Sequence, residues 1–203
     1  LKVSLIQSWY MKIIIKINKY KQLKNKTFTT DQPLFESYMD SIAAVSKSTT
    51  AGSNGVAGVV GGKYLCSANG IEYTQLIEKG LMGAIFYYQA ISYYMENIAT
   101  KDNTTVTAGK GTEMEHNWDE AFGYTGANTT LDDATYIYHA KYSGKGEDAG
   151  LKTRTNLMQA FLAGRAAISA KDMDRKTVEA ANVRKYMEEV TATTAIHYLN
   201  GGK

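Results

Sequence analysis

The chain has 203 residues, of which 44% are hydrophobic and 21% are charged, so it is long enough to bury the core of a globular domain. Its net charge of +3 comes from residues 1–26, which hold seven lysines and no acidic residue. Residues 27–203 carry 16 basic against 20 acidic residues, which excludes a basic nucleic-acid-binding body. We therefore expect no nucleic-acid partner.

Residues 1–26 are predicted to be a basic extension, either non-native or disordered, with a short basic helix as the alternative. The apolar run 13–15 is too short for a signal peptide and is flanked by lysines. The most apolar stretch of the chain, residues 81–95, is shorter than a membrane span needs. We expect no transmembrane segment in this chain.

The first helical pattern begins near Thr30, which is predicted to cap a helix that has Pro33 in its first turn. Residues 48–62 are rich in Gly, Ser and Thr and are predicted to form a loop. The single cysteine, Cys66, excludes an internal disulfide, and no base lies beside it in the sequence. A packed or passive thiol is therefore favoured over a nucleophile.

The strongest helical pattern covers residues 71–98. Its apolar stripe alternates spacings of four and three over five turns and consists of Ile77, Leu81, Ala84, Tyr88, Ile91 and Met95. Gly80 and Gly83 interrupt this pattern, and a closely packed neighbour is a plausible reason for glycine there.

Thr112 and Glu115 have the spacing of a capping box, which predicts a helix to about residue 122. Residues 123–150 are predicted to be a long connection of the kind that is often functional or mobile. Two further helices are predicted at about 151–170 and 172–199. No strand-like alternation appears, so the fold class is all-α: an antiparallel bundle of about five helices within a domain at 27–203.

Four runs resemble an uncharacterised family of bacterial surface lipoproteins with a His-x-Trp-Asp-Glu-Ala-Phe-Gly-Tyr motif. The runs are residues 49–58, 71–80, 113–124 and 195–200. The similarity extends over residues 31–203, and members of that family are longer than this chain. The resemblance implies a truncated domain that works in the periplasm or at the outer-membrane surface.

More distantly, the chain resembles the imelysin group, which consists of iron-regulated periplasmic helical bundles that are linked to iron uptake and classed by some as peptidases. Their Gly-x-His-x-x-Glu signature falls here on Met114, His116 and Asp119, so two of its three positions differ. This resemblance implies a fragment of an imelysin-like bundle, with iron or another divalent cation as the cofactor. It also implies an outer-membrane uptake component as the partner.

The predicted helix at 112–122 has two faces. Glu113, His116 and Glu120 share one face, while the opposite face is apolar and aromatic, with Met114, Trp118 and Phe122. A Glu-x-x-His spacing is used by metal-binding bundles, so one hypothesis is a cation held by His116, Glu120 and Glu113. In the alternative the charged face meets water, and His116 with Glu120 is a pair worth about 0.2–0.5 kcal/mol.

The predicted ligand-binding residues come mainly from this motif, and none is assigned a catalytic role. They are Glu113, His116, Trp118, Asp119, Glu120, Tyr124, Arg165 and His197. Arg165 would need an acid if buried, and a motif carboxylate is one partner; otherwise it snorkels at the bundle edge. His197 shares a face with Val190 and Thr194, which favours a core histidine over a ligand.

The leading hypothesis is a non-enzymatic, iron-related binding or uptake-accessory protein outside the cytoplasm. One alternative is an imelysin-type metal-dependent peptidase with His116 as a ligand. The enzyme is less favoured because the sequence has no His-Glu-x-x-His, Gly-x-Ser-x-Gly or Walker motif. A second alternative is a structural module that docks to an outer-membrane partner through the tyrosine-rich residues 124–142.

Overall fold

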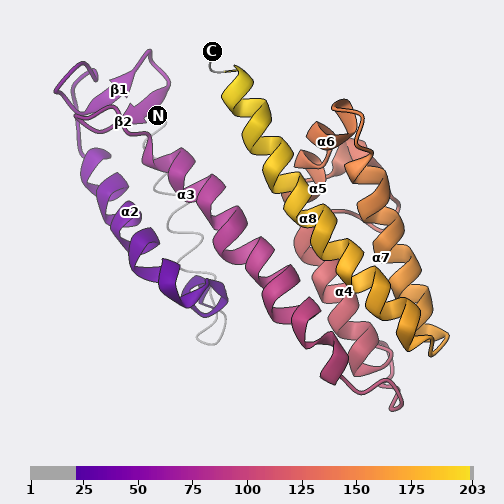
Figure 1. The fold of residues 1–203 in the computed structure, drawn as a ribbon. Helices are drawn as coiled ribbons and strands as arrows, with labels where there is room; N and C mark the ends of the chain where they lie inside the picture. Colours follow the sequence, from indigo (N-terminus) through magenta and orange to yellow (C-terminus); the bar gives the residue numbers. More distant parts are fainter. Residues whose placement is uncertain (1–21, 202–203) are drawn as a thin grey trace. The chain divides into compact units, whose positions relative to one another are not determined.

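The computed structural model describes residues 22–201, so most of the predicted extension at 1–26 lies outside the described residues. Figure 1 shows that the described chain is mainly helical, which confirms the predicted all-α class. The chain divides into two compact units, residues 1–85 and 86–203. Each unit is described by itself below.

The first unit contains two helices and a small hairpin. Its described elements are 3₁₀ turns at Leu23–Lys26 and Thr29–Asp31, helix α2 at Gln32–Val45, strands β1 at Gly58–Val60 and β2 at Tyr64–Cys66, and helix α3 at Tyr73–Leu81. Strands β1 and β2 pair antiparallel, with Gly58 opposite Cys66. The expectation of a plain loop was wrong here, because three-residue strands are too short to show an alternating pattern.

Helix α2 begins with proline in its first turn, as predicted, but its cap differs from the prediction. Thr30 belongs to a 3₁₀ turn, and the residue before the helix, Asp31, makes no side-chain cap bond. The ring of Phe35 lies 2.7 Å from the position that a Cβ on Gly80 would occupy. Close packing of α2 on α3 therefore explains Gly80. A Cβ added to Gly83 would meet no atom of the described residues within 4 Å, so packing does not explain that glycine.

The long helix predicted at 71–98 changes character along its length. After α3 it continues as a π-helix over Met82–Met95. Its buried side chains include Ile85, Ala90 and Met95, which follow the five-residue spacing of π-type hydrogen bonding. The α-helical period predicted for this segment was therefore wrong, although Ala84, Ile91 and Met95 of the predicted stripe are buried. Tyr88 is only half-buried.

The second unit holds the main core. After the π-helix its described elements are a 3₁₀ turn at Ile98–Thr100, α4 at Glu113–Thr125, a 3₁₀ turn at Asp133–Thr135, α5 at Tyr138–Tyr142, α6 at Gly144–Asp148, α7 at Thr153–Ser169 and α8 at Met173–Gly201. Helices α4, α7 and α8 lie side by side in Figure 1. The predicted connection at 123–150 thus contains two short helices, each too short to give a periodic signal.

The core forms where the aromatic face of α4 meets α7. Trp118 is almost completely buried, and its ring packs edge-on against Phe161 with centroids 5.9 Å apart. A Cβ on Gly164 would lie only 2.1 Å from the Trp118 ring. Glycine at this position therefore lets the indole approach the backbone of α7.

The first turn of α7 is tied to α6 by one carboxylate. Glu147 accepts hydrogen bonds from the backbone N–H of Arg154 at 2.9 Å and of Thr155 at 3.2 Å. Two N–H groups that have no intrahelical partner at a helix start are thereby satisfied.

Among residues 22–201, no helix is long and apolar enough to cross a membrane.

Candidate functional site

The motif helix α4 starts at the capping box predicted from the sequence. The Thr112 hydroxyl accepts from the Glu115 backbone N–H at 3.2 Å, and the Glu115 Oε2 accepts from the Thr112 N–H at 2.8 Å. These reciprocal bonds satisfy two backbone donors and fix where the helix begins. They also fix the carboxylate of Glu115 at the N-terminal end of α4.

The other oxygen of Glu115 faces α7. Oε1 accepts from the Ser169 hydroxyl at 2.7 Å and from Arg165 Nη1 at 2.8 Å. The bonds from Ser169 and from the Thr112 backbone, together with the Arg165 charge, lower the pKa of Glu115 to about 2. Glu115 is therefore a carboxylate at any physiological pH and links α4 to α7.

Arg165 is held by two residues of the motif helix. Its Nη1 contacts Glu115, and its Nε donates to Asp119 Oδ1 at 2.9 Å. This confirms that a motif carboxylate pairs with Arg165. Because two ion pairs and the Ser169 hydroxyl fix the guanidinium, its orientation is set by the protein alone.

The loop before α4 is anchored by a buried asparagine. Asn103 Nδ2 donates to the Ile168 carbonyl at 2.8 Å, and its Oδ1 accepts from the Thr112 hydroxyl at 2.8 Å. The backbone carbonyl of Asn103 also accepts from Lys171 Nζ. The loop is thus attached both to the start of α4 and to the end of α7.

A cavity of about 470 Å³ lies between this loop and the two helices. Its lining consists of residues 106–111 together with His116, Asp119 and Arg165. The loop closes on itself, since the Thr107 N–H donates to the Gly111 carbonyl at 2.8 Å. Three residues that the sequence singled out on two helices therefore meet at one polar cavity.

A family profile described as a domain of unknown function, DUF4856, matches residues 15–203. The chain belongs to the DUF4856 family. This confirms that the chain belongs to an uncharacterised family. The comparison with curated proteins and the comparison with solved structures each found no match.

The three predicted metal-binding residues of this DUF4856 domain do not all contact one another. Glu113 forms an ion pair with Lys101 at 3.0 Å, while Glu120 lies 3.8 Å from the Nε2 of His116. The His116–Glu120 pair is exposed to solvent on α4. Within residues 22–201, no three His, Cys, Asp or Glu side chains are grouped so that they could hold a metal ion.

Two other predicted ligand-binding residues, Trp118 and Tyr124, are not among the described residues that line the cavity. The indole N–H of Trp118 donates to the Phe161 carbonyl at 2.9 Å within the core. The ring of Tyr124 is half-buried and lies 5.8 Å from that of Tyr94. Burial of Tyr94 raises its pKa to about 12, and the nearby Glu120 carboxylate adds to that rise.

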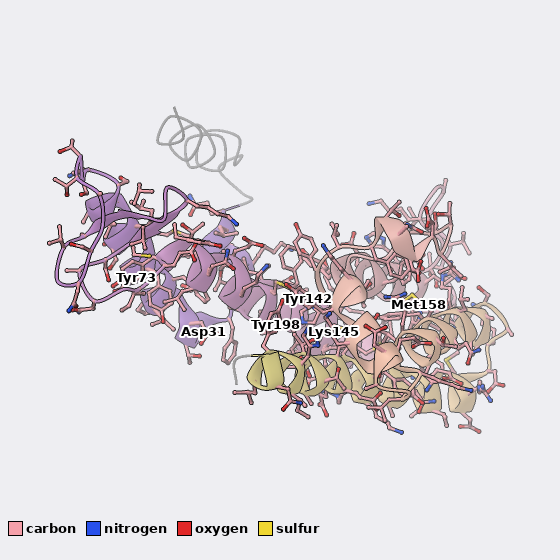
Figure 2. All side chains as sticks on the ribbon, turned by 90° about the horizontal axis from the view of Figure 1, so that it is seen from above. Asp31, Tyr73, Tyr142, Lys145, Met158 and Tyr198 are labelled. Atoms are coloured by element: carbon pink, nitrogen blue, oxygen red, sulfur yellow. The ribbon has the colours of Figure 1, made fainter. Side chains whose placement is uncertain are left out.

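The end of α8 differs from the sequence prediction. His197 is exposed, so the prediction of a core histidine was wrong. The physical reason is that Val190 is the last buried residue of α8, so the turns that follow contribute no buried side chain to the described core. Figure 2 shows Tyr198 of this segment near Tyr142 of α5, with ring centroids 6.4 Å apart.

The tyrosine-rich segment of the DUF4856 domain is partly packed and partly exposed, with Ile137 51% and Tyr138 38% exposed. Tyr136 is buried, and Tyr138 stacks on Phe86 with ring centroids 4.0 Å apart. These contacts are made within the domain, whereas the docking hypothesis concerns contacts with a partner. They give that hypothesis no support.

Sequence reasoning missed three residues of this unit that carry charge or titrate. Glu115 was recognised only as part of a capping box, and Lys110 was not among the predicted ligand-binding residues. His139 gave no signal, yet it is buried and its Nδ1 has no hydrogen-bond partner among the described residues. Burial lowers the pKa of His139 to about 4.

Proposed function

We propose that this DUF4856 domain is a non-enzymatic binding protein that holds a small polar ligand in the cavity beside α4. One observation carries the proposal: His116, Asp119 and Arg165 line the same cavity. Polar side chains from separate elements that converge on a concave site are the usual basis of ligand recognition.

The surrounding hydrogen bonds support binding because they position the cavity wall before a ligand arrives. Arg165 is fixed by Glu115, Asp119 and Ser169, and the loop is fixed through Asn103. Less side-chain freedom is then lost when a ligand binds, which favours affinity.

We further propose that the domain works outside the cytoplasm, in the periplasm or at the outer-membrane surface, as an accessory to uptake. The support is the resemblance of residues 113–124 to the motif of bacterial surface lipoproteins. In the iron-related form of this proposal the ligand contains iron or another cation. His116 and Asp119 are the groups of the cavity that would contact it.

The test is a thermal-shift screen of the purified chain against amino acids, sugars, organic acids, phosphate, and ferric and divalent ions. A ligand present at about 100 times its Kd should stabilise the protein by about 2.7 kcal/mol. We expect His116→Ala to reduce the shift and His197→Ala, at an exposed histidine that does not line the cavity, to leave it unchanged.

Mass-spectrometric elemental analysis of the dialysed protein separates the cation form of the proposal from the others. Stoichiometric metal in the wild type that is lost in His116→Ala would establish the cation. If no compound in the screen stabilises the wild type more than His116→Ala, the binding function is refuted.

A further inference from the structure

The cavity lining includes two cationic side chains with unused hydrogen-bond donors, Arg165 and Lys110. The Nη2 group of Arg165 has two N–H bonds and no acceptor among residues 22–201, because the hydrogen bonds of the guanidinium all involve Nε and Nη1. Lys110 on the loop is exposed, and its ammonium likewise has no partner among these residues. Both side chains belong to the cavity lining.

The backbone of the loop adds two further unused donors. The N–H groups of Lys110 and Gly111 bond back to the Thr107 carbonyl. Those of Ala108 and Gly109 have no acceptor within the described part of the chain. Gly109 has a φ of +75°, a conformation that glycine allows without strain. Two adjacent amides of residues that line the cavity are therefore without an acceptor in this part of the chain.

Among the described residues of the lining, Asp119 supplies the one carboxylate, and one of its oxygens is already occupied. Its Oδ1 accepts from Arg165 Nε at 2.9 Å. The nearby carboxylate of Glu115 lies behind the guanidinium, and both of its oxygens accept hydrogen bonds from the protein. Glu115 and Asp119 together carry as much negative charge as Arg165 and Lys110 carry positive charge. An anion is therefore recognised through the unused donors of Arg165 and Lys110, and the charge of Asp119 weakens its binding.

We infer that the ligand presents an oxyanion, meaning a carboxylate or a phosphate group, to Arg165 Nη2 and Lys110 in this cavity. An oxyanion supplies several acceptors at short range, and guanidinium and ammonium groups bond to such oxygens with charge-assisted hydrogen bonds. The inference rests on the proposed binding function and specifies its ligand class.

The experiment is isothermal titration calorimetry of the full chain at low ionic strength. The probes are inorganic phosphate and citrate, with glucose as a neutral probe and magnesium chloride as a cationic one. The variants are Lys110→Gln, Asp119→Asn and the control Lys141→Gln, an exposed lysine of α5 outside the cavity lining. Thermal melts of each variant verify that it is folded.

We expect saturable binding of phosphate, of citrate, or of both, and the preferred probe shows which oxyanion fits. Lys110→Gln should weaken this binding about twofold to fivefold, the size expected for an exposed charge contact. Asp119→Asn should tighten it, because the substitution removes a negative charge and keeps an oxygen for Arg165 Nε. Lys141→Gln should have no effect.

Three results would overturn the inference. One is no saturable binding of either anion. Another is anion binding that Asp119→Asn weakens or that Lys110→Gln leaves unchanged. The third is saturable binding of glucose or magnesium in place of the anions, if that binding is lost in Asp119→Asn. The last result would leave the proposed binding function standing, and the thermal-shift screen decides that function separately.

Discussion

Glu115 illustrates how one side chain can serve both the fold and the site. Its Oε2 completes the cap of α4, and its Oε1 holds Arg165 and Ser169. A single residue therefore fixes the start of the motif helix and orients the guanidinium at the cavity. Glu115 does not line the cavity itself, so its effect on ligand binding is a positioning effect.

Replacing Glu115 by Gln should destabilise the protein by about 1–3 kcal/mol, because the amide cannot satisfy all of the donors that the carboxylate accepts. Urea unfolding followed by circular dichroism measures the loss. The matched control is Glu113→Gln, an exposed acid of the same helix whose ion pair with Lys101 is also exposed. A smaller loss for Glu115→Gln than for Glu113→Gln would refute this role.

His139 predicts how stability depends on pH. Burial lowers its pKa from 6.5 to about 4 in the folded chain, so the unfolded chain takes up the proton first. Its neutral form stabilises the fold fully above pH 6.5, and that contribution is lost as the pH falls toward 4. At pH 5 the loss should be on the order of 2 kcal/mol.

The measurement is the urea midpoint at pH 7.5 and at pH 5, for the wild type and for His139→Gln. The variant removes the titration, so the difference between its two midpoints should be smaller than for the wild type. Equal differences in the two proteins would show that the imidazole remains accessible to protons in the folded state.

At the scale of the helices, the contact between α4 and α7 depends on a missing side chain. Gly164→Ala would place a Cβ 2.1 Å from the Trp118 ring. Because the indole is buried, this clash can be relieved only if the helices move apart. We expect a loss of about 1–3 kcal/mol despite the higher helix propensity of alanine.

Gly123→Ala is the matched control, because Gly123 also lies in a helix of this unit and a Cβ there would contact nothing within 4 Å. Alanine should stabilise α4 by up to about 1 kcal/mol. Circular-dichroism melts of both variants compare the two effects. If both substitutions stabilise the protein, the close approach of Trp118 to α7 is not what requires glycine.

The sequence predicted those elements whose signals are local. The Thr112–Glu115 spacing identified the start of α4, and the apolar periodicity identified α7 and α8. The π-helix at Met82–Met95 was read with an α-helical period, since the two spacings overlap over a few residues. The three-residue strands and the five-residue helices were too short to be recognised.

The candidate site was predicted in part for a similar reason. His116, Asp119 and Arg165 stood out by motif or by an expected ion pair, and the fold brings them to one cavity. The contribution of residues 106–111 depends on a loop that is positioned by Asn103, and that contact spans 65 residues of sequence. No local pattern encodes such a contact.

At the scale of the whole molecule, burial is distributed unevenly between the two units. The cluster of buried apolar side chains formed by the described residues begins at Ala90 and ends at Val190, so it lies within the second unit. The described part of the first unit relies on the packing of α2 on α3 and on a short hairpin.

Native-state hydrogen exchange should therefore show slower amide exchange in α4, α7 and α8 than in α2 and the β1–β2 hairpin, because opening costs less where few apolar contacts are broken. Mass spectrometry of peptic peptides gives the comparison. Equal protection of residues 32–66 and 153–190 would mean that the first unit is stabilised by contacts that its own burial does not account for.

The position of Trp118 gives the domain an internal optical reporter. The indole lies in the seam between α4 and α7, and its sequence neighbour Asp119 and the nearby His116 line the cavity. The chain contains one other tryptophan, Trp9, so a Trp9→Phe variant would emit from Trp118 alone. Its emission wavelength and lifetime would then report on the α4–α7 seam during ligand titration, without an attached dye.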